Sequence, residues 1–302
     1  MKRSPILVTG ANGLVGAACT AAFTEAGREV VPISRCGLGG PAIDLSRPFE
    51  EGLATLNFSG ARIPEVIVHM AAAVPHDARY PDSPDSAALT RAIDRHVACA
   101  CEAWGSRVIY MSSCSVYARR DTIPNSPRSP LADNLTHYAA AKVDGERLFR
   151  ERDAAIFRLS APVGANMRPG LVFSRFASAC RTGHPIELWG TGTREQDFIH
   201  LDDICDLMLL ATDSEVAGTY ICARGRPVTM AKLAEEMVNF YGRGSVVAAE
   251  RVDPLDGETA RYDISDSKRA FGWEPRRDLA AMLTSFENGM HSLPTLGAEE
   301  GR

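Results

Sequence analysis

The amino-acid sequence predicts an α/β fold, with a doubly wound parallel sheet and a smaller C-terminal α/β lobe. Three observations lead to this prediction. Short apolar runs typical of buried parallel strands alternate with helical patterns over residues 1–160. A glycine-rich turn at residues 9–16 joins the first apolar run to the first helical pattern. Over residues 161–302 the alternation loosens into short segments, which favours a cap, although part of this chain can return to the main sheet.

The composition is that of an ordinary globular chain. Its 302 residues, 45% of them hydrophobic, can fill a sizeable core, and its net charge of −5 lacks the basic run that a nucleic-acid partner requires. The apolar run at residues 6–8 is too short for an export signal, and no run approaches the roughly 18 residues of a membrane span. We therefore expect a cytoplasmic protein with no membrane partner. The eight cysteines are scattered without a Cys-x-x-Cys pair, so we expect buried thiols and no metal site.

The turn at residues 9–16 has the glycine spacing of a diphosphate-binding turn. Gly10 permits the tight turn, Gly13 lets the backbone approach a diphosphate, and Gly16 lets the helix lie against the strand. A plain strand-to-helix turn is the alternative, because a glycine pattern alone has low specificity. The dinucleotide interpretation makes residues 1–160 a Rossmann-type cofactor domain. It predicts cofactor contacts from Gly10, Asn12, Gly13, Leu14, Val15 and Gly16.

The second predicted strand, at residues 29–33, ends at Ser34 and Arg35. A carboxylate at this place would bind a ribose hydroxyl and select NAD. An arginine can instead pair with a ribose 2′-phosphate, so the sequence favours NADP over NAD. Stacking of a surface Arg35 on adenine is the alternative, and it is compatible with NAD. Residues 42–44 predict a short third strand, after which Asp44 and Leu45 are expected beside the adenine.

Two further buried strands are predicted at residues 66–70 and 107–111, with a helix over 87–104 between them. His69 lies inside the first of these strands. We interpret it as a core residue, because catalysis requires access to the cleft. Residues 119–136 carry three prolines, which predicts a long loop with a functional role. Small side chains that let a cofactor approach the backbone follow the first strand, at Ala71, Ala72 and Ala73.

A helix from residue 138 to about 152 carries the chemistry. Its three consecutive alanines favour helix, and the i,i+4 spacing places Tyr138 and Lys142 on one face. A free phenol has a pKa near 10, and a lysine ammonium beside it, together with a cationic nicotinamide, would lower that pKa. Ser113, at the end of the preceding strand, would hold the substrate oxygen beside the phenol. We therefore expect Ser113, Tyr138 and Lys142 to be catalytic, and the last two to contact the cofactor as well.

Together these motifs resemble the extended short-chain dehydrogenase/reductase family, which comprises nucleotide-sugar epimerases, dehydratases and ketoreductases. The resemblance covers nearly the whole chain. It implies that Tyr138 is the general acid/base, that Lys142 also binds the nicotinamide ribose, and that a homodimer is expected. It also implies that the catalytic hydroxyl lies four residues before Tyr117, at Ser113, with Ser112 and Ser115 as weaker candidates. The matching segments are residues 9–16, 69–72, 112–117, 138–142 and 190–204.

The sequence also departs from the pattern of this family. An arginine that binds the diphosphate in several members is Gln196 here, and Arg194 is a candidate replacement. A usual asparagine is Ala161, a usual arginine is Leu255, and the helix near residues 93–94 lacks its usual asparagine. These losses weaken the nucleotide-diphosphate part of the interpretation more than the redox part.

The family's 4,6-dehydratases carry Asp-Glu directly after the catalytic hydroxyl, where this chain has Cys114 and Ser115. Dehydration is therefore disfavoured. Cys114 is itself a candidate acid/base, as in a related epimerase-reductase with a similar Ser-Ser-Cys segment. We favour a packing role for it, because a thiol transfers protons only where it is exposed and its pKa is tuned.

The cap is expected to close over the carboxyl ends of the strands and to supply substrate specificity. Arg168, Arg194 and His200 are candidates for substrate contact, and for each of them a surface or capping role has equal weight. Helices are predicted in this lobe over residues 172–181, 201–212, 230–241 and 278–290, and the tail from Ser292 is expected to fray.

The sequence thus predicts an NAD(P)-dependent epimerase or ketoreductase. Its substrate would be a secondary alcohol or ketone of a sugar, nucleotide-linked, with Tyr138 as general acid/base. Two alternatives are an NADP-dependent reductase of a non-sugar ketone and a non-catalytic NAD(P)-binding regulator. The presence of Ser113, Tyr138 and Lys142 together speaks against the regulator, because a binding module has no need of a proton relay.

Overall fold

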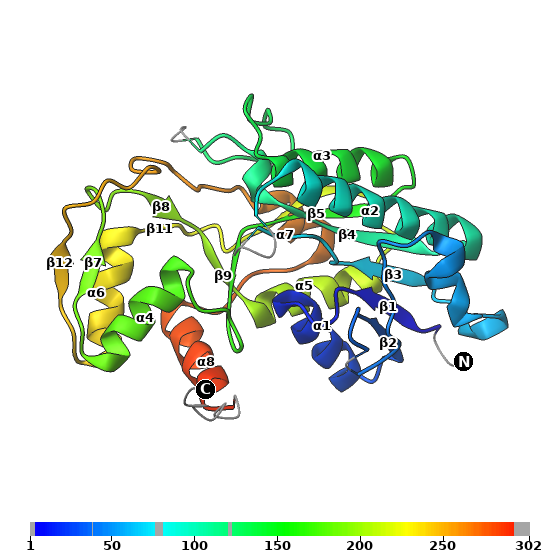
Figure 1. Cartoon of the computed structure of the whole chain (residues 1–302), viewed down its shortest axis with the longest axis horizontal. Helices are drawn as coiled ribbons and strands as arrows, with labels where there is room; N and C mark the ends of the chain where they lie inside the picture. The colour runs from blue at the N-terminus through cyan, green and yellow to red at the C-terminus, as the bar shows by residue number, and fades with distance from the viewer. Residues whose placement is uncertain (1–3, 38, 76–80, 120–122, 293–302) are drawn as a thin grey trace, which may run out of the picture.

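Six parallel strands form the central sheet, in the order β10-β5-β4-β3-β1-β2 (Figure 1). The computed structural model describes residues 4–37, 39–75, 81–119 and 123–292. Every neighbouring pair in this sheet is parallel, so the carboxyl ends of all its strands lie along one edge. The strands are β1 (Ile6–Thr9), β2 (Val30–Ile33), β3 (Val66–His69), β4 (Arg107–Ser113), β5 (Ala155–Leu159) and β10 (Gly218–Cys222).

Helices cover both faces of the sheet (Figure 1). On one face α1 (Leu14–Glu25) packs against α5 (Leu201–Thr212), and on the other α2 (Pro84–Trp104) packs against α3 (His137–Arg150). Alternation along β1 explains the two layers. Ile6 and Val8 join the apolar cluster that contains α1 and α5 side chains, whereas Leu7 joins the cluster that contains α2 side chains. The doubly wound, Rossmann-type sheet that the sequence predicts is confirmed.

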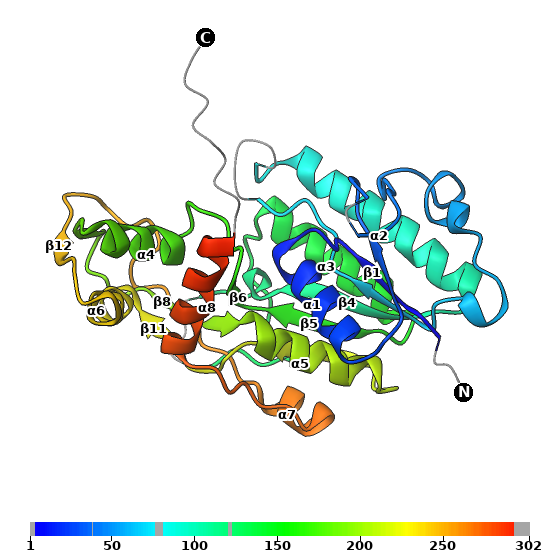
Figure 2. The same cartoon turned by 90° about the horizontal axis from the view of Figure 1, so that it is seen from below.

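The smaller lobe is built around a third apolar cluster, to which α4, α6 and α8 contribute (Figure 2). Among the described residues its strands form three two-stranded sheets, β11-β8, β12-β7 and β6-β9. Its elements are β6 (Ala161–Val163), α4 (Val172–Thr182), β7 (Ile186–Leu188), β8 (Glu195–Gln196), β9 (Phe198–His200), β11 (Val228–Thr229), α6 (Met230–Tyr241), β12 (Val246–Ala248) and α8 (Leu279–Ser292).

The chain passes between the two lobes more than once. After β9 it returns to the central sheet through α5 and β10, and β10 pairs with β5 as an edge strand. It then enters the smaller lobe again, and later α7 (Ser265–Phe271) packs beside β10. Part of the chain after residue 161 therefore belongs to the sheet lobe.

Residues 42–44 do not form the third strand that the sequence predicts. Ala42 makes a single bridge, to Ser34 just beyond β2. Gly37 and Gly39 both have positive φ angles, so the chain turns sharply before it reaches this segment. Short 3-10 turns follow at η1 (Phe49–Glu51), η2 (Leu53–Leu56) and η3 (Gly60–Arg62).

The last helix ends at Ser292, so the tail that the sequence predicts to fray lies outside the described residues. Within the described ranges, no helix combines the length and the apolar character that crossing a bilayer requires.

Candidate active site

The topology of the sheet opens a crevice at the carboxyl ends of β1 and β3. The chain leaves β1 for β2 on one side, and it later places β3 on the other side of β1. The glycine-rich turn lies at this point. Gly10 has a φ of +68°, and a Cβ added there would lie 2.8 Å from the nitrogen of Ala71, while a Cβ at Gly16 would lie 2.2 Å from the carbonyl oxygen of Gly10. Both positions therefore require glycine.

The start of α1 fits a diphosphate. Gly13 precedes this helix, and within the described ranges no side chain caps it, so N–H groups of its first turn are open to an anion. Leu14 packs against the apolar clusters of both lobes, and Val15 packs against that of the sheet lobe. Asn12 Nδ2 donates to Cys36 Sγ at 2.6 Å, which ties the turn to the segment after β2. The predicted cofactor turn thus lies where the two lobes meet.

The residues expected near the adenosine lie after β2. Ser34 is buried, and its Oγ has no hydrogen-bond partner among the described residues. Arg35 is exposed, as is Asp44. Hydrogen bonds from Ser46 lower the pKa of the Asp44 carboxyl, and the charge of Arg35 lowers it further. Leu45 is buried. The Asp44 carboxylate would therefore compete with a cofactor phosphate for the positive charge of Arg35.

A buried polar chain lies under the carboxyl end of β3. Thr9 Oγ1 accepts the N–H groups of Met70 and Ala71 at 3.2 and 3.3 Å and lies 2.7 Å from His69 Nδ1. Because the two backbone N–H groups occupy both lone pairs of the Thr9 oxygen, its hydroxyl donates to His69 Nδ1. This assigns the ring proton to Nε2, which donates to Asp94 Oδ1 at 2.9 Å. Burial lowers the pKa of His69, which agrees with a neutral ring. His69 is fully buried, so the prediction of a core role is confirmed.

Three alanines follow β3. Ala71 and Ala72 are half-buried, and Ala73 is buried.

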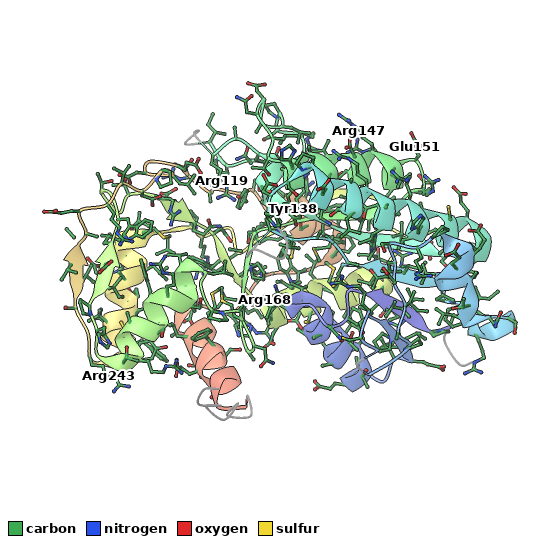
Figure 3. All side chains as sticks on the ribbon, viewed as in Figure 1. Arg119, Tyr138, Arg147, Glu151, Arg168 and Arg243 are labelled. Atoms are coloured by element: carbon green, nitrogen blue, oxygen red, sulfur yellow. The ribbon has the colours of Figure 1, made fainter. Side chains whose placement is uncertain are left out.

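The three predicted catalytic residues come together at the ends of β4 and α3. Ser113, the last residue of β4, lies close enough to Tyr138, in the first turn of α3, for its hydroxyl to lower the pKa of the phenol. One turn further along α3, Lys142 is 2% exposed and its Nζ donates to the carbonyl oxygen of Met111 at 2.8 Å. Figure 3 shows Tyr138 between the lobes. The arrangement presents a phenol, a hydroxyl and an ammonium from neighbouring elements at one edge of the sheet.

The pKa of Tyr138 differs from the sequence-based expectation. Burial raises it to about 12, the Ser113 hydroxyl lowers it in part, and the negative charge of Asp94 raises it. The sequence predicts that Lys142 lowers this pKa, but the burial of the phenol outweighs any such effect. Burial also lowers the pKa of Lys142, which the charges of Asp94 and Glu146 counteract.

The residues around Ser113 have separate roles. Ser112 donates to Glu146 Oε1 at 2.6 Å inside the core, so its hydroxyl is occupied. Ser113 Oγ accepts the N–H of Ser115 at 3.1 Å, and Ser115 Oγ is buried without a partner among the described residues. Cys114 is 1% exposed, its Sγ contacts the carbonyl oxygen of Arg158 at 3.2 Å, and burial raises its pKa. These facts favour the packing role for Cys114.

A buried ion pair anchors the long loop after β4. Arg158 on β5 donates to both oxygens of Glu146 on α3, at 2.8 and 2.7 Å. The same guanidinium donates to Tyr117 Oη at 2.6 Å and to the carbonyl oxygen of Pro127 at 3.3 Å. Tyr117 in turn donates to the carbonyl oxygen of Ser126 at 2.8 Å. The loop is therefore fastened to the sheet close to Ser113.

The candidates in the smaller lobe do not all face the crevice. Arg194 pairs with Asp253 at 3.2 Å, so its charge is already compensated. His200 is 3% exposed and caps α5 by accepting the N–H of Asp202 at 3.0 Å, so it takes the capping role. Arg168 is exposed on the loop after β6 and lies between the lobes (Figure 3).

Two cationic features, one between the lobes and one within the smaller lobe, were not predicted from the sequence. Arg119, after β4, lies between the lobes (Figure 3) and approaches Gln196 Oε1 at 3.5 Å. Gln196 is the residue that stands where the resembled family has an arginine. In the smaller lobe, the guanidinium groups of Arg175 and Arg251 lie 5.3 and 5.2 Å from the ring of Trp189. No spacing in the sequence signals either contact, because each joins residues far apart in the chain.

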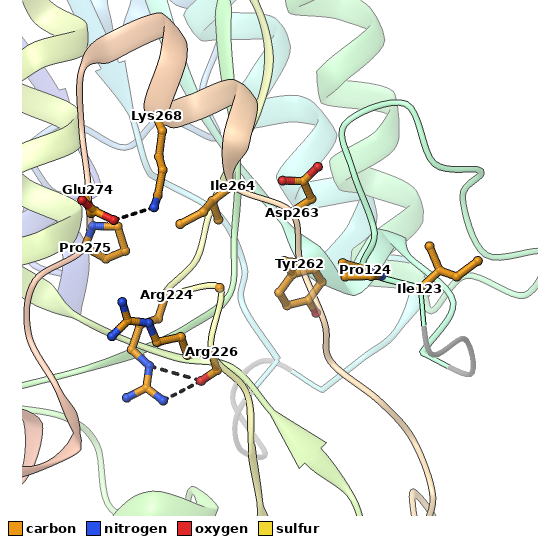
Figure 4. Close-up of a pocket in the computed structure, with 11 residues that line it drawn as sticks. Ile123, Pro124, Arg224, Arg226, Tyr262, Asp263, Ile264, Lys268, Glu274 and Pro275 are labelled. Atoms are coloured by element: carbon orange, nitrogen blue, oxygen red, sulfur yellow. Dashed lines mark hydrogen bonds and ion pairs between the residues drawn. The ribbon is translucent and has the colours of Figure 1, made fainter.

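A separate cavity of about 410 Å³ lies between the loop after β10, the loop after β4 and α7 (Figure 4). None of the predicted catalytic residues lines it. Arg224 donates there to the carbonyl oxygen of Arg226, and Lys268 pairs with Glu274. Its lining residues are Ile123, Pro124, Arg224, Gly225, Arg226, Tyr262, Asp263, Ile264, Lys268, Glu274 and Pro275.

A glycine turn at the switch point of a doubly wound sheet, with a serine, a tyrosine and a lysine at the same edge, defines the class of dinucleotide-dependent enzymes of the extended short-chain dehydrogenase type. The model of the NAD dependent epimerase/dehydratase family matches residues 6–223. The chain belongs to this family, and it is an NAD(P)-dependent enzyme.

Relatives agree with this assignment. The dTDP-glucose 4,6-dehydratase of Streptomyces antibioticus is 26% identical over 303 residues, which cover 91% of this chain and 89% of the relative. The structure of a UDP-N-acetylglucosamine 4-epimerase from Bacillus cereus has a TM-score of 0.82 at 18% identity, over 96% of this chain and 98% of that one. The Bordetella bronchiseptica enzyme WbmG, in complex with NAD and UDP, has a TM-score of 0.79 at 21% identity, over 95% and 93% of the two chains.

Proposed function

We propose that this protein is an NAD(P)-dependent epimerase or ketoreductase that acts on a secondary alcohol or ketone of a nucleotide-linked sugar. The observation that carries the proposal is the approach of the Ser113 hydroxyl to the Tyr138 phenol at the carboxyl edge of the sheet, with Lys142 one helical turn away. WbmG, which has a similar fold, is described with NAD and UDP. A curated relative acts on dTDP-glucose, which supports a nucleotide sugar as substrate.

Each of the three side chains has a distinct role in this proposal. Tyr138 moves a proton to or from the sugar oxygen, and Ser113 orients that oxygen by hydrogen bonding. Lys142 places a positive charge beside the phenol and the cofactor ribose, which favours phenolate when the proton leaves. A bound nicotinamide supplies the hydride acceptor or donor. Cys114 is buried where dehydratases carry an acid, so elimination of water is not part of the proposal.

Arginines between the lobes are proposed to hold the substrate anion. Arg168 is exposed there, and Arg119 makes a long contact of 3.5 Å to the neutral Gln196 side chain. Arg194 is a weaker candidate for this role than Arg119 and Arg168, because Asp253 already compensates its charge. A guanidinium pairs well with a diphosphate, so Arg119→Gln and Arg168→Gln should each raise KM more than they lower kcat.

NADP is the proposed cofactor preference, carried by Arg35 at the end of β2 and by the absence of a carboxylate at that place. The Asp44 carboxylate nearby opposes it, and WbmG is described with NAD. Titration of the protein with NADP and NAD side by side tests the preference. Equal dissociation constants, or tighter binding of NAD, would remove it, and Arg35→Gln should weaken NADP selectively.

Epimerase and ketoreductase are separated by the fate of the cofactor. A dinucleotide that co-purifies with the protein and is not consumed during turnover of a UDP- or dTDP-sugar supports the epimerase. Stoichiometric loss of NADPH or NADH supports the reductase. Turnover of a non-sugar ketone alone would favour the alternative reductase, and binding without turnover of any substrate would favour a regulator. Sedimentation equilibrium tests the expected homodimer.

A further inference from the structure

Lys142 is a charged side chain inside the core. It is 2% exposed, its Nζ donates to the carbonyl oxygen of Met111, and the same Nζ lies 4.6 Å from the centroid of the Tyr110 ring. Among the described residues no carboxylate pairs with it directly. A buried ammonium is stable only near a compensating negative charge, so the source of that charge matters for any role of Lys142.

Two buried acids lie close enough for their charges to act on Lys142, namely Asp94 on α2 and Glu146 on α3. Glu146 is already committed, because Arg158 binds both of its oxygens. Among the described residues, Asp94 accepts hydrogen bonds from two neutral groups, His69 Nε2 and Tyr110 Oη, each at 2.9 Å, and from no charged one. These bonds solvate the carboxylate without neutralising it. Its net negative charge is therefore left for Lys142.

The same carboxylate touches the helix that carries the catalytic pair. A Cβ added to Gly145 on α3 would lie 2.4 Å from Asp94 Oδ2 and 2.2 Å from Tyr110 Oη. α3 thus rests directly on the pair formed by Asp94 and Tyr110, one turn beyond Lys142. On its other side, Asp94 is linked through His69 to Thr9, at the start of the glycine-rich turn.

We propose that Asp94 is a positioning residue of the active site, which acts as the counter-charge that keeps Lys142 protonated in the core and which seats α3 against the end of β3. This inference rests on the proposed function only for the catalytic consequence. The structural part concerns the charge state of one side chain, and it can be measured without turnover.

The charge state can be measured directly, because the sequence has four lysines, Lys2, Lys142, Lys232 and Lys268. In protein labelled with 13C at lysine Cε, the Lys142 signal is assigned by its loss in Lys142→Arg, and its chemical shift is followed with pH. In Asp94→Asn the midpoint should fall by about one pH unit or more, which is about a tenfold loss of proton affinity. An unchanged midpoint would overturn the proposal.

Two control variants separate charge from packing. Asp144→Asn removes a carboxylate that pairs with Arg91 on the surface, and it should leave the Lys142 midpoint unmoved. Tyr110→Phe keeps the Asp94 charge, so Lys142 should also keep its proton. If Tyr110→Phe lowers the midpoint as much as Asp94→Asn does, packing rather than charge explains the effect and the proposal fails.

A second measurement covers the case in which Asp94→Asn does not fold. The carboxyl 13C shift of Asp94 in the unaltered protein should be that of an ionised group at pH 7, and a protonated carboxyl there would overturn the proposal. With an active enzyme, Asp94→Asn should shift the alkaline limb of the kcat profile to lower pH with KM nearly unchanged. Absence of nucleotide-sugar turnover would count against the proposed function alone, because the titration needs no substrate.

Discussion

Replacement of Arg158 by methionine tests the ion pair that fastens the loop after β4. The change leaves the Glu146 carboxylate, which is 1% exposed, with Ser112 as a close donor in the core and with the largely exposed Arg150, at 3.7 Å, as a weaker charge partner. Removing one partner of a buried ion pair typically costs about 3–5 kcal/mol, since the other charge stays buried and uncompensated. Loss of the bonds to Tyr117 and Pro127 adds to this cost. Against a total stability of about 5–15 kcal/mol, Arg158→Met should be among the most damaging single changes.

Urea unfolding, followed by circular dichroism, measures this loss. Arg147→Met is the matched control, because Arg147 is 69% exposed in its pair with Asp144 and should change stability by less than about 1 kcal/mol. The double variant Glu146→Leu with Arg158→Met removes both charges and should recover much of the loss. If Arg158→Met behaves like Arg147→Met, or if the double variant is no better than the single one, the buried-charge argument is wrong.

Three further predictions concern the active site. Gly16→Ala places a Cβ 2.2 Å from the carbonyl oxygen of Gly10, so dinucleotide binding, measured by calorimetry, should fall sharply, whereas Gly27→Ala, at a φ of +74° with no atom within 4 Å of the added Cβ, should cost stability and leave binding intact. Tyr138→Phe should lower kcat by about 10²–10⁴-fold while the dissociation constant of the dinucleotide stays nearly the same; comparable kcat in both proteins would remove the phenol from the mechanism. Ser113→Ala removes the hydroxyl that lowers the pKa of Tyr138, so in ultraviolet titration the phenolate should form at higher pH than in the unaltered protein, and formation at lower pH would contradict the role of Ser113.

The elements that periodicity and glycine spacing define were predictable from the sequence. The continuous apolar runs of β3 and β4 are typical of buried strands, and the Tyr138–Lys142 spacing on an alanine-rich segment favours one helical face, as the structure shows. The confirmed family and sheet follow from such local patterns. The strand expected at residues 42–44 failed, because Gly37 and Gly39 turn the chain first.

The electrostatics of the site were not predictable in the same way. Asp94 and Glu146 are single polar residues on otherwise ordinary helices, and their importance depends on partners on other strands. The pKa of Tyr138 depends on how deeply the phenol is buried, a property of the whole fold, so the expected lowering by Lys142 could not be checked from spacing. The pairing of Arg194 with Asp253 likewise joins distant segments.

The return of the chain from the smaller lobe to the sheet has a consequence for dissection of the protein. A fragment that stops near residue 160 would lack β10. Its β5 would then be an edge strand with unpaired backbone N–H and C=O groups, which could pair with the same strand of another molecule. Such a fragment should accumulate as insoluble aggregate, whereas cleavage of the intact chain in a surface loop should leave both pieces associated.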